Sequence, residues 1–77
     1  MFLEIITPDQ KIYSGDISRV MVPGSKGSFE VLDNHAPIIS TLTKGKIKVT
    51  DKQGIQSFEI IAGVVEVLKN KIIILAE

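Results

Sequence analysis

The chain has 77 residues, with nine basic and nine acidic side chains, no cysteine and a formal net charge of zero. This length suits one small domain, residues 1–77, which neither a disulfide framework nor a thiolate metal site can support. The balanced charge gives no reason to expect nucleic acid or an anionic membrane surface as a partner. The longest apolar run, 72–76, is too short to cross a bilayer. The first residues lack the features of a signal peptide, so a cytoplasmic location is the starting expectation.

Apolar and polar residues alternate along most of the chain, as is typical of strands with one buried and one wet face. In chain order, the strands predicted from this pattern are 18–22, 28–32, 38–42, 46–50, 57–61, 64–68 and 71–75. The last two are rich in β-branched residues, and we expect them to be buried on more than one side.

Clusters of glycine, proline, aspartate and asparagine separate these runs and predict turns. The turns are expected at 7–9, 14–16, 23–27, 43–45, 51–54, 62–63 and 69–70. No window of ten or more residues has helical periodicity. The spacing therefore predicts an all-β fold, a flattened sandwich of two sheets with about eight to ten short strands. The expected core is formed by Val20, Val22, Phe29, Val31, Ile47, Val49, Phe58, Ile60, Val65, Val67, Ile72 and Ile74.

His35 is the only histidine and the first candidate for chemistry. As a general base it would need an orienting acid and a nucleophile, and only Asp33 is near it in the sequence. As a metal ligand it would need further histidines or a carboxylate cluster at ligand spacing. We therefore interpret His35 as a structural or interface residue and expect no catalytic, metal or cofactor site.

Two loops need a second interpretation. The segment Pro23–Gly27 has the composition of a phosphate-binding loop, but such a loop opens a helix and this one opens a strand. Lys52 is predicted at a hairpin tip, as in lipoyl and biotinyl carrier domains of similar size. The alternative is a solvated turn lysine in a four-residue loop that Gly54 closes through a bulge. A carrier domain and a generic interaction sandwich remain alternative functions, and intact mass would reveal a carrier's cofactor.

Six short motifs follow one another along the chain. They are Leu3–Pro8, Tyr13–Gly15, Gly24–Phe29, His35–Pro37 with Leu42 and Gly45, Gly63–Val67, and Asn70 with Ile74–Glu77. With these motifs the chain resembles, over essentially its full length, the amino-terminal β-sandwich domain of the epsilon subunit of F-type ATP synthases. Most members continue into a pair of carboxy-terminal helices, so the resemblance is to a short form that ends at Glu77.

The resemblance implies a non-catalytic rotor subunit of the central stalk, on the cytoplasmic face of the bacterial inner membrane and without direct membrane insertion. It would couple the gamma subunit to the c-ring during proton-driven ATP synthesis. The matching positions imply that His35, Ile38 and Ser40 face gamma. They imply that Ser25, Lys26 and Ser28 face the polar loops of the c-ring.

The resemblance also bears on regulation. In longer relatives the carboxy-terminal helices can block rotation, and in some of them nucleotide binding holds those helices folded. Because the sequence stops at Glu77 and its glycine-rich loop opens a strand, we expect neither self-inhibition by such helices nor meaningful ATP affinity from these 77 residues.

Overall fold

The computed structural model describes all 77 residues and consists of nine β-strands without a helix. The strands are β1 (Phe2–Ile6), β2 (Lys11–Asp16), β3 (Arg19–Val22), β4 (Phe29–Leu32), β5 (Ile38–Leu42), β6 (Gly45–Asp51), β7 (Gly54–Ile60), β8 (Gly63–Leu68) and β9 (Lys71–Ala76). Their number lies within the predicted range.

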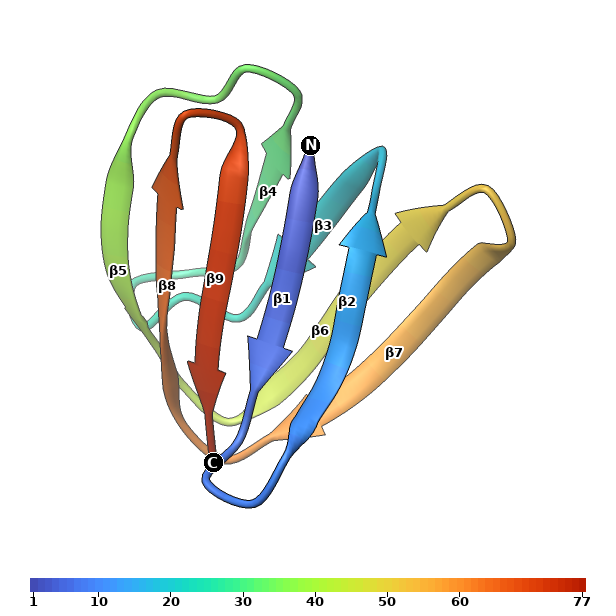
Figure 1. Cartoon of the computed structure of the whole chain (residues 1–77). Coiled ribbons are helices and arrows are strands. Elements are labelled where there is room, and N and C mark those ends of the chain that lie inside the picture. The colour runs from blue at the N-terminus through green and yellow to red at the C-terminus, as the bar shows by residue number, and fades with distance from the viewer.

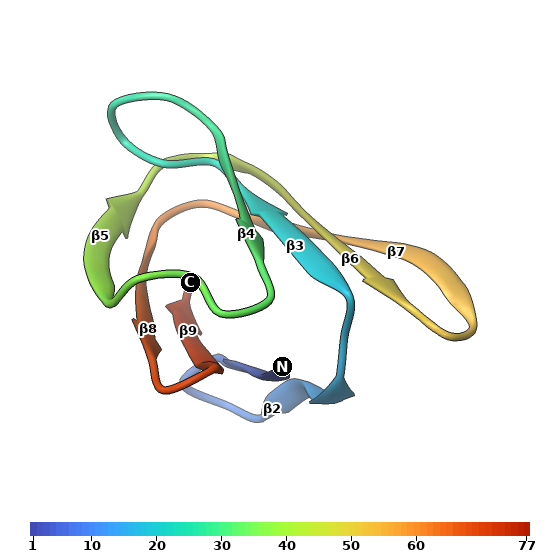
Figure 2. The ribbon, with the colours of Figure 1, turned by 90° about the horizontal axis from the view of Figure 1, so that it is seen from above.

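The strands form two sheets that pack face to face (Figures 1 and 2). The first sheet has five strands in the order β2-β1-β9-β8-β5, and the second has four in the order β4-β3-β6-β7. All paired strands are antiparallel except β1 and β9, which run parallel. The predicted all-β sandwich of two sheets is therefore confirmed.

The amino-terminal hairpin departs from the sequence prediction. Residues 14–16 were expected to form a turn, but they end strand β2, where Leu3 pairs with Gly15 and Phe2 with Asp16. The turn of this hairpin is the one predicted at 7–9, which is confirmed: the Thr7 backbone N–H donates to the Gln10 carbonyl oxygen at 2.8 Å. A glycine near the end of an edge strand does not break it when a neighbouring strand supplies the hydrogen bonds. Pairing with β1, which the alternation did not identify, decides this segment.

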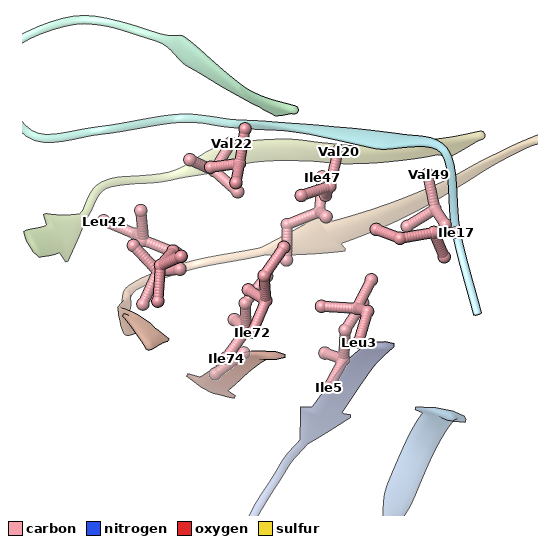
Figure 3. Close-up of a cluster of buried hydrophobic side chains, with 14 of the residues drawn as sticks. Leu3, Ile5, Ile17, Val20, Val22, Leu42, Ile47, Val49, Ile72 and Ile74 are labelled. Carbon is pink, nitrogen blue, oxygen red and sulfur yellow. The ribbon is translucent and has the colours of Figure 1, made fainter. Parts of the chain in front are cut away.

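The core lies between the sheets, as Figure 3 shows for side chains that meet from both. Of the twelve predicted core residues, ten are buried, and Phe29 and Phe58 are half-buried against the cluster. Five further core residues were not predicted. They are Leu3 and Ile5 from β1, Ile17 from the β2–β3 connection, Leu42 at the end of β5 and Ala76 at the end of β9.

The predicted burial of β8 and β9 on more than one side is wrong for this chain by itself. Val65 and Ile74 point into the core, but Val64 and Leu75 on the opposite side are exposed. No third layer covers the outer face of the five-stranded sheet (Figures 1 and 2). The apolar content of these strands therefore exceeds what the core uses.

The β8–β9 hairpin helps to fix the loop that carries the histidine. Its two turn residues, Lys69 and Asn70, have φ angles of 52° and 61°, as a type I′ turn requires. The Asn70 side-chain oxygen accepts a hydrogen bond from the Asn34 backbone N–H at 2.9 Å. The β8–β9 turn thus holds the β4–β5 connection, residues 33–37, at one end of the sandwich.

Candidate partner-binding surfaces

The β3–β4 loop, residues 23–28, is fastened to strand β5. Gly24 forms an isolated antiparallel bridge with Leu42. The Ser25 backbone N–H donates to the Thr41 carbonyl oxygen at 3.0 Å, and the Thr41 hydroxyl donates to the Ser25 hydroxyl at 2.9 Å. In Figure 2 the loop projects from the body of the sandwich on the side of β5. These contacts join a loop and a strand that belong to different sheets.

A groove of about 610 Å³ lies between this loop and β5, lined by residues 24–29 and 38–41. The three positions that the resemblance assigned to the c-ring, Ser25, Lys26 and Ser28, are exposed on one side of it. Lys26 takes part in no ion pair within the chain. Ile38 and Ser40, two of the three positions assigned to gamma, line the other side. The fold therefore brings five of the six residues to one groove.

His35 is the sixth residue and does not line the groove. It lies half-buried in the β4–β5 connection, where its backbone N–H donates to the Leu32 carbonyl oxygen at 3.2 Å. Its Nδ1 lies 2.7 Å from the Ala36 carbonyl oxygen, which can only accept, so this nitrogen carries a proton. The imidazole is held by its own loop, with no carboxylate or nucleophile bonded to it.

The register of β5 decides which of its side chains a partner can reach. Ile38 and Ser40 pair with Val67 and Val65, which are buried, so their side chains point to the inner side of the sheet. Ile38 is half-buried and packs against the core. Ile39 points outward and is 73% exposed. Ile39 was not among the positions that the resemblance assigned to gamma, and alternation cannot tell which of two adjacent isoleucines points inward.

The outer face of the five-stranded sheet is the second open surface. Ile39, Val64, Ile73 and Leu75 form an apolar hollow with Glu66 at its side. A groove of about 510 Å³ continues from Val64 and Leu75 toward the β1–β2 turn. Ile39, Val64 and Leu75 are exposed on this face, and Ile73 between them is half-buried.

Charged groups border this apolar face on β1 and its neighbours. Lys11 Nζ lies 2.6 Å from Glu4 Oε2, and Lys71 Nζ lies 3.9 Å from Glu4 Oε1. The hydrogen bond from Lys11 lowers the pKa of the Glu4 carboxyl, and the charges of both lysines act in the same direction. Glu4 is therefore ionised at neutral pH and marks one polar boundary of the face.

Tyr13 and Asp51 link the two sheets at the opposite side of the molecule. The Tyr13 hydroxyl on β2 donates to Asp51 Oδ2 on β6 at 2.7 Å. Burial and this hydrogen bond raise the pKa of Tyr13 to about 12, and the same bond lowers the pKa of Asp51.

Lys52 lies next to Asp51, at the exposed tip of the β6–β7 hairpin, in a turn where Gly54 has a φ of 122°. The predicted position of Lys52 at a hairpin tip is confirmed. The loop has two residues, Lys52 and Gln53, instead of the predicted four, because Asp51 pairs with Gly54.

The molecule contains no group of three or more histidine or acidic side chains arranged to hold a metal ion. None of its elements is a long apolar helix that could span a membrane. Its surface features are the two grooves and the apolar face described above, on a small β-sandwich without a metal-binding cluster.

A family model described as the β-sandwich domain of the ATP synthase delta/epsilon chain matches residues 1–77. The chain belongs to this family.

Three relatives, all named ATP synthase epsilon chain, agree with the assignment. The Campylobacter curvus protein is 41% identical, and the alignment covers 100% of this chain and 60% of that one. The Chlorobaculum tepidum protein is 40% identical, with 97% and 86% covered, and the Caulobacter vibrioides protein is 36% identical, with 100% and 90% covered. The chain thus spans between 60% and 90% of the length of these relatives.

Two solved structures have the same fold. One is a chain of the Tetrahymena thermophila mitochondrial ATP synthase, from a cryo-EM structure of its central stalk and c-ring, with a TM-score of 0.85 at 20% identity. The match covers 97% of this chain and 61% of that one. The other is from the Euglena gracilis mitochondrial ATP synthase, with a TM-score of 0.89 at 19% identity and 96% and 48% covered. At these identities the similarity concerns the fold.

Proposed function

We propose that this domain is the epsilon-type component of an F-type ATP synthase central stalk and joins the gamma subunit to the c-ring during proton-driven ATP synthesis. In this role it is peripheral to the membrane, on the cytoplasmic face of the bacterial inner membrane, and does no chemistry itself. The observation that carries the proposal is the family match over residues 1–77. The names of the relatives and the central-stalk origin of one solved structure support it.

The groove between the β3–β4 loop and β5 suits such a joint. In the proposal Lys26 and Ser28 meet the polar loops of the c-ring, while β5 and His35 meet gamma. Force applied to the loop reaches β5 through the Ser25–Thr41 contacts, which are short and lie on both backbone and side chains. A rotor part needs this kind of stiffness, because a loose loop would absorb the displacement that it has to transmit.

The family match argues against the carrier-domain alternative. Lys52 is exposed at a hairpin tip, as a carrier lysine would be, but the same is true of an ordinary turn lysine. Intact mass spectrometry of the protein from its native source separates the two functions. A discrete added mass on Lys52 would support the carrier function, and an unmodified lysine supports the turn.

The direct test is reconstitution. The purified domain is mixed with the gamma subunit of the same enzyme and analysed by size-exclusion chromatography, and the complex is then added to detergent-solubilised c-ring. We expect co-elution with gamma and capture of the gamma complex on the ring. Failure of the domain to bind gamma would overturn the proposal.

Matched charge reversals locate the ring contact. Lys26→Glu reverses an exposed charge on the β3–β4 loop, and Lys48→Glu reverses one on the outer face of β6. We expect Lys26→Glu to weaken ring capture and Lys48→Glu to leave it unchanged. Equal effects of the two variants would contradict the assignment of the loop to the ring.

A further inference from the structure

The free edge of strand β5 has unpaired backbone groups beside the groove. β5 is the last strand of its sheet and pairs only with β8 along its length. Successive residues of a strand direct their backbone N–H and C=O groups to opposite neighbours. Thr41 accepts from Ser25, and the Thr43 N–H donates to the Pro23 carbonyl oxygen, so odd-numbered residues face the free edge.

The next odd-numbered residue toward the start of β5 is Ile39. Its N–H and C=O, together with the N–H of Thr41, face the free edge and make no hydrogen bond within the chain. Two residues before Ile39, the edge-facing position is Pro37, which has no N–H to offer. The open edge is therefore short and bounded, by Pro37 at one end and by the bridge between Gly24 and Leu42 at the other.

The loop that occupies the first part of this edge then turns away from it. Pro23, Gly24 and Ser25 lie against β5 like a short strand, and the chain leaves the edge after Ser25. The groove of about 610 Å³ opens where the chain leaves. A second extended segment can continue the line of residues 23–25 and bond to Ile39 and Thr41, with its side chains in the groove.

We propose that the edge at Ile39 and Thr41 is a strand-addition site, where an extended segment of the gamma subunit pairs with β5 and lies in the groove. The inference rests on the proposed function for the identity of the partner. Strand addition uses main-chain hydrogen bonds for affinity and pockets for alternate side chains for selectivity, and this site has both. It also explains how β5 can contact gamma although Ile38 and Ser40 point inward.

The variant Ile39→Pro tests the site because it removes the edge-facing N–H without removing a hydrogen bond of the domain. Proline is tolerated at the edge of a sheet when its nitrogen faces outward. Losing one of three backbone bonds weakens gamma binding by about tenfold or more. The control is Ile39→Val, which keeps the N–H and the β-branched shape and should bind within about twofold of the parent.

Amide hydrogen exchange, followed by NMR, gives a measurement that needs no variant. In the free domain the amides of Ile39 and Thr41 should exchange fast, while that of Ser40, which faces β8, is protected. Adding gamma should slow exchange at Ile39 and Thr41 by at least about tenfold and leave Ser40 unchanged.

Each outcome decides the question. Slow exchange at both amides together with weak binding of Ile39→Pro supports strand addition. Normal gamma binding with both amides still in fast exchange overturns it while leaving the proposed function intact. Protection by the c-ring and not by gamma overturns the choice of partner. Absence of any gamma binding overturns the proposed function as well.

Discussion

The outer faces of the two sheets differ in composition, although the inner faces of both sheets consist mainly of valine, isoleucine and leucine. The outer face of the five-stranded sheet has an apolar centre formed by Ile39, Val64, Ile73 and Leu75. On the outer face of the four-stranded sheet, charged and apolar residues alternate between strands, as where Met21 lies between Glu30 and Lys48. The second face mixes charged and apolar side chains, whereas the first has a contiguous group of aliphatic ones at its centre.

The comparison shows that the apolar pattern of a strand does not tell whether one or both of its faces are buried within the domain. Apart from Glu66 and Lys71, β8 and β9 are apolar on both sides, and the sandwich buries one of those sides. A strand buried on both faces within its own domain would have the same sequence. The inner and outer residues of β9 should therefore contribute very differently to the stability of the domain alone, and variants can measure this.

The largest effect is expected from truncation of the inner side of β9. Ile74 is 0% exposed, and Ile74→Ala should lower the free energy of unfolding by about 2–5 kcal/mol, because it leaves a cavity between the sheets. Leu75→Ala, one residue away and 55% exposed, should change it by about 0.5 kcal/mol or less. Urea unfolding at neutral pH measures both. Similar losses would mean that the two sides of β9 are equivalent in the isolated domain.

A backbone contact at the start of β8 should produce the next largest effect. A Cβ added at Gly63 would lie 2.6 Å from the Leu75 carbonyl oxygen on β9, which cannot move without disturbing the sheet. Gly63→Ala should therefore destabilise the domain by about 1–3 kcal/mol. Gly15→Ala is the matched control in β2, where the nearest atom is the Tyr13 hydroxyl oxygen at 3.6 Å. If thermal unfolding showed Gly63→Ala to be as stable as Gly15→Ala, the close packing of β8 on β9 would be refuted.

The Tyr13–Asp51 link should produce a smaller, pH-dependent effect. The pKa of Tyr13 is raised to about 12 in the folded state, so its contribution to stability is complete below pH 10 and is lost as pH rises toward 12. The pKa of Asp51 is lowered below its usual 3.8, so its contribution is present above that pH and is lost as pH falls through the folded-state value. Tyr13→Phe should abolish the alkaline loss and reduce the acid one.

Tyr13 is the only tyrosine of the chain, so ultraviolet absorbance follows its ionisation without interference from a second phenol. Stability is measured by urea unfolding at each pH, and the difference between the parent and Tyr13→Phe cancels the titration of the lysines. A parent phenol that titrates at the ordinary value of 10 would show that the link does not persist in solution.

The smallest effect on stability is expected from charges placed on the outer faces of the sheets. Binding of an apolar dye should nevertheless distinguish the two faces. The pair Ile39→Lys and Leu75→Lys should change the free energy of unfolding by about 0.5 kcal/mol per site or less. The same pair should reduce the fluorescence of the apolar dye ANS, because it interrupts the apolar centre. The control pair, Leu32→Lys and Ile55→Lys on the four-stranded sheet, has similarly exposed residues and should leave the fluorescence unchanged. Equal loss of fluorescence from both pairs would remove the distinction between the faces.

The sequence by itself determined the features that depend on neighbouring residues: the strands, their inward-facing side chains and the turns. Alternation identified the strands from Arg19 onward to within about one residue, except β7, which begins three residues before the predicted start at 57. It also predicted ten of the buried side chains, because the period of two is set by the strand geometry. Turn residues located hairpins such as Lys69–Asn70, where asparagine tolerates a positive φ. The order of the motifs indicated the family that the comparisons then identified.

Only the tertiary structure decided what depends on pairing between distant segments. β1 pairs in parallel with β9, nearly a full chain length away, and this pairing turns Leu3 and Ile5 into core residues. The register between β5 and β8 turns Ile38 inward and Ile39 outward, and the alternation of two adjacent isoleucines could not choose between them. The groove beside β5 also exists only because the β3–β4 loop crosses to the other sheet. The physical reason is that a one-residue change of register reverses every side chain of a strand, and the register is fixed by the partner strand.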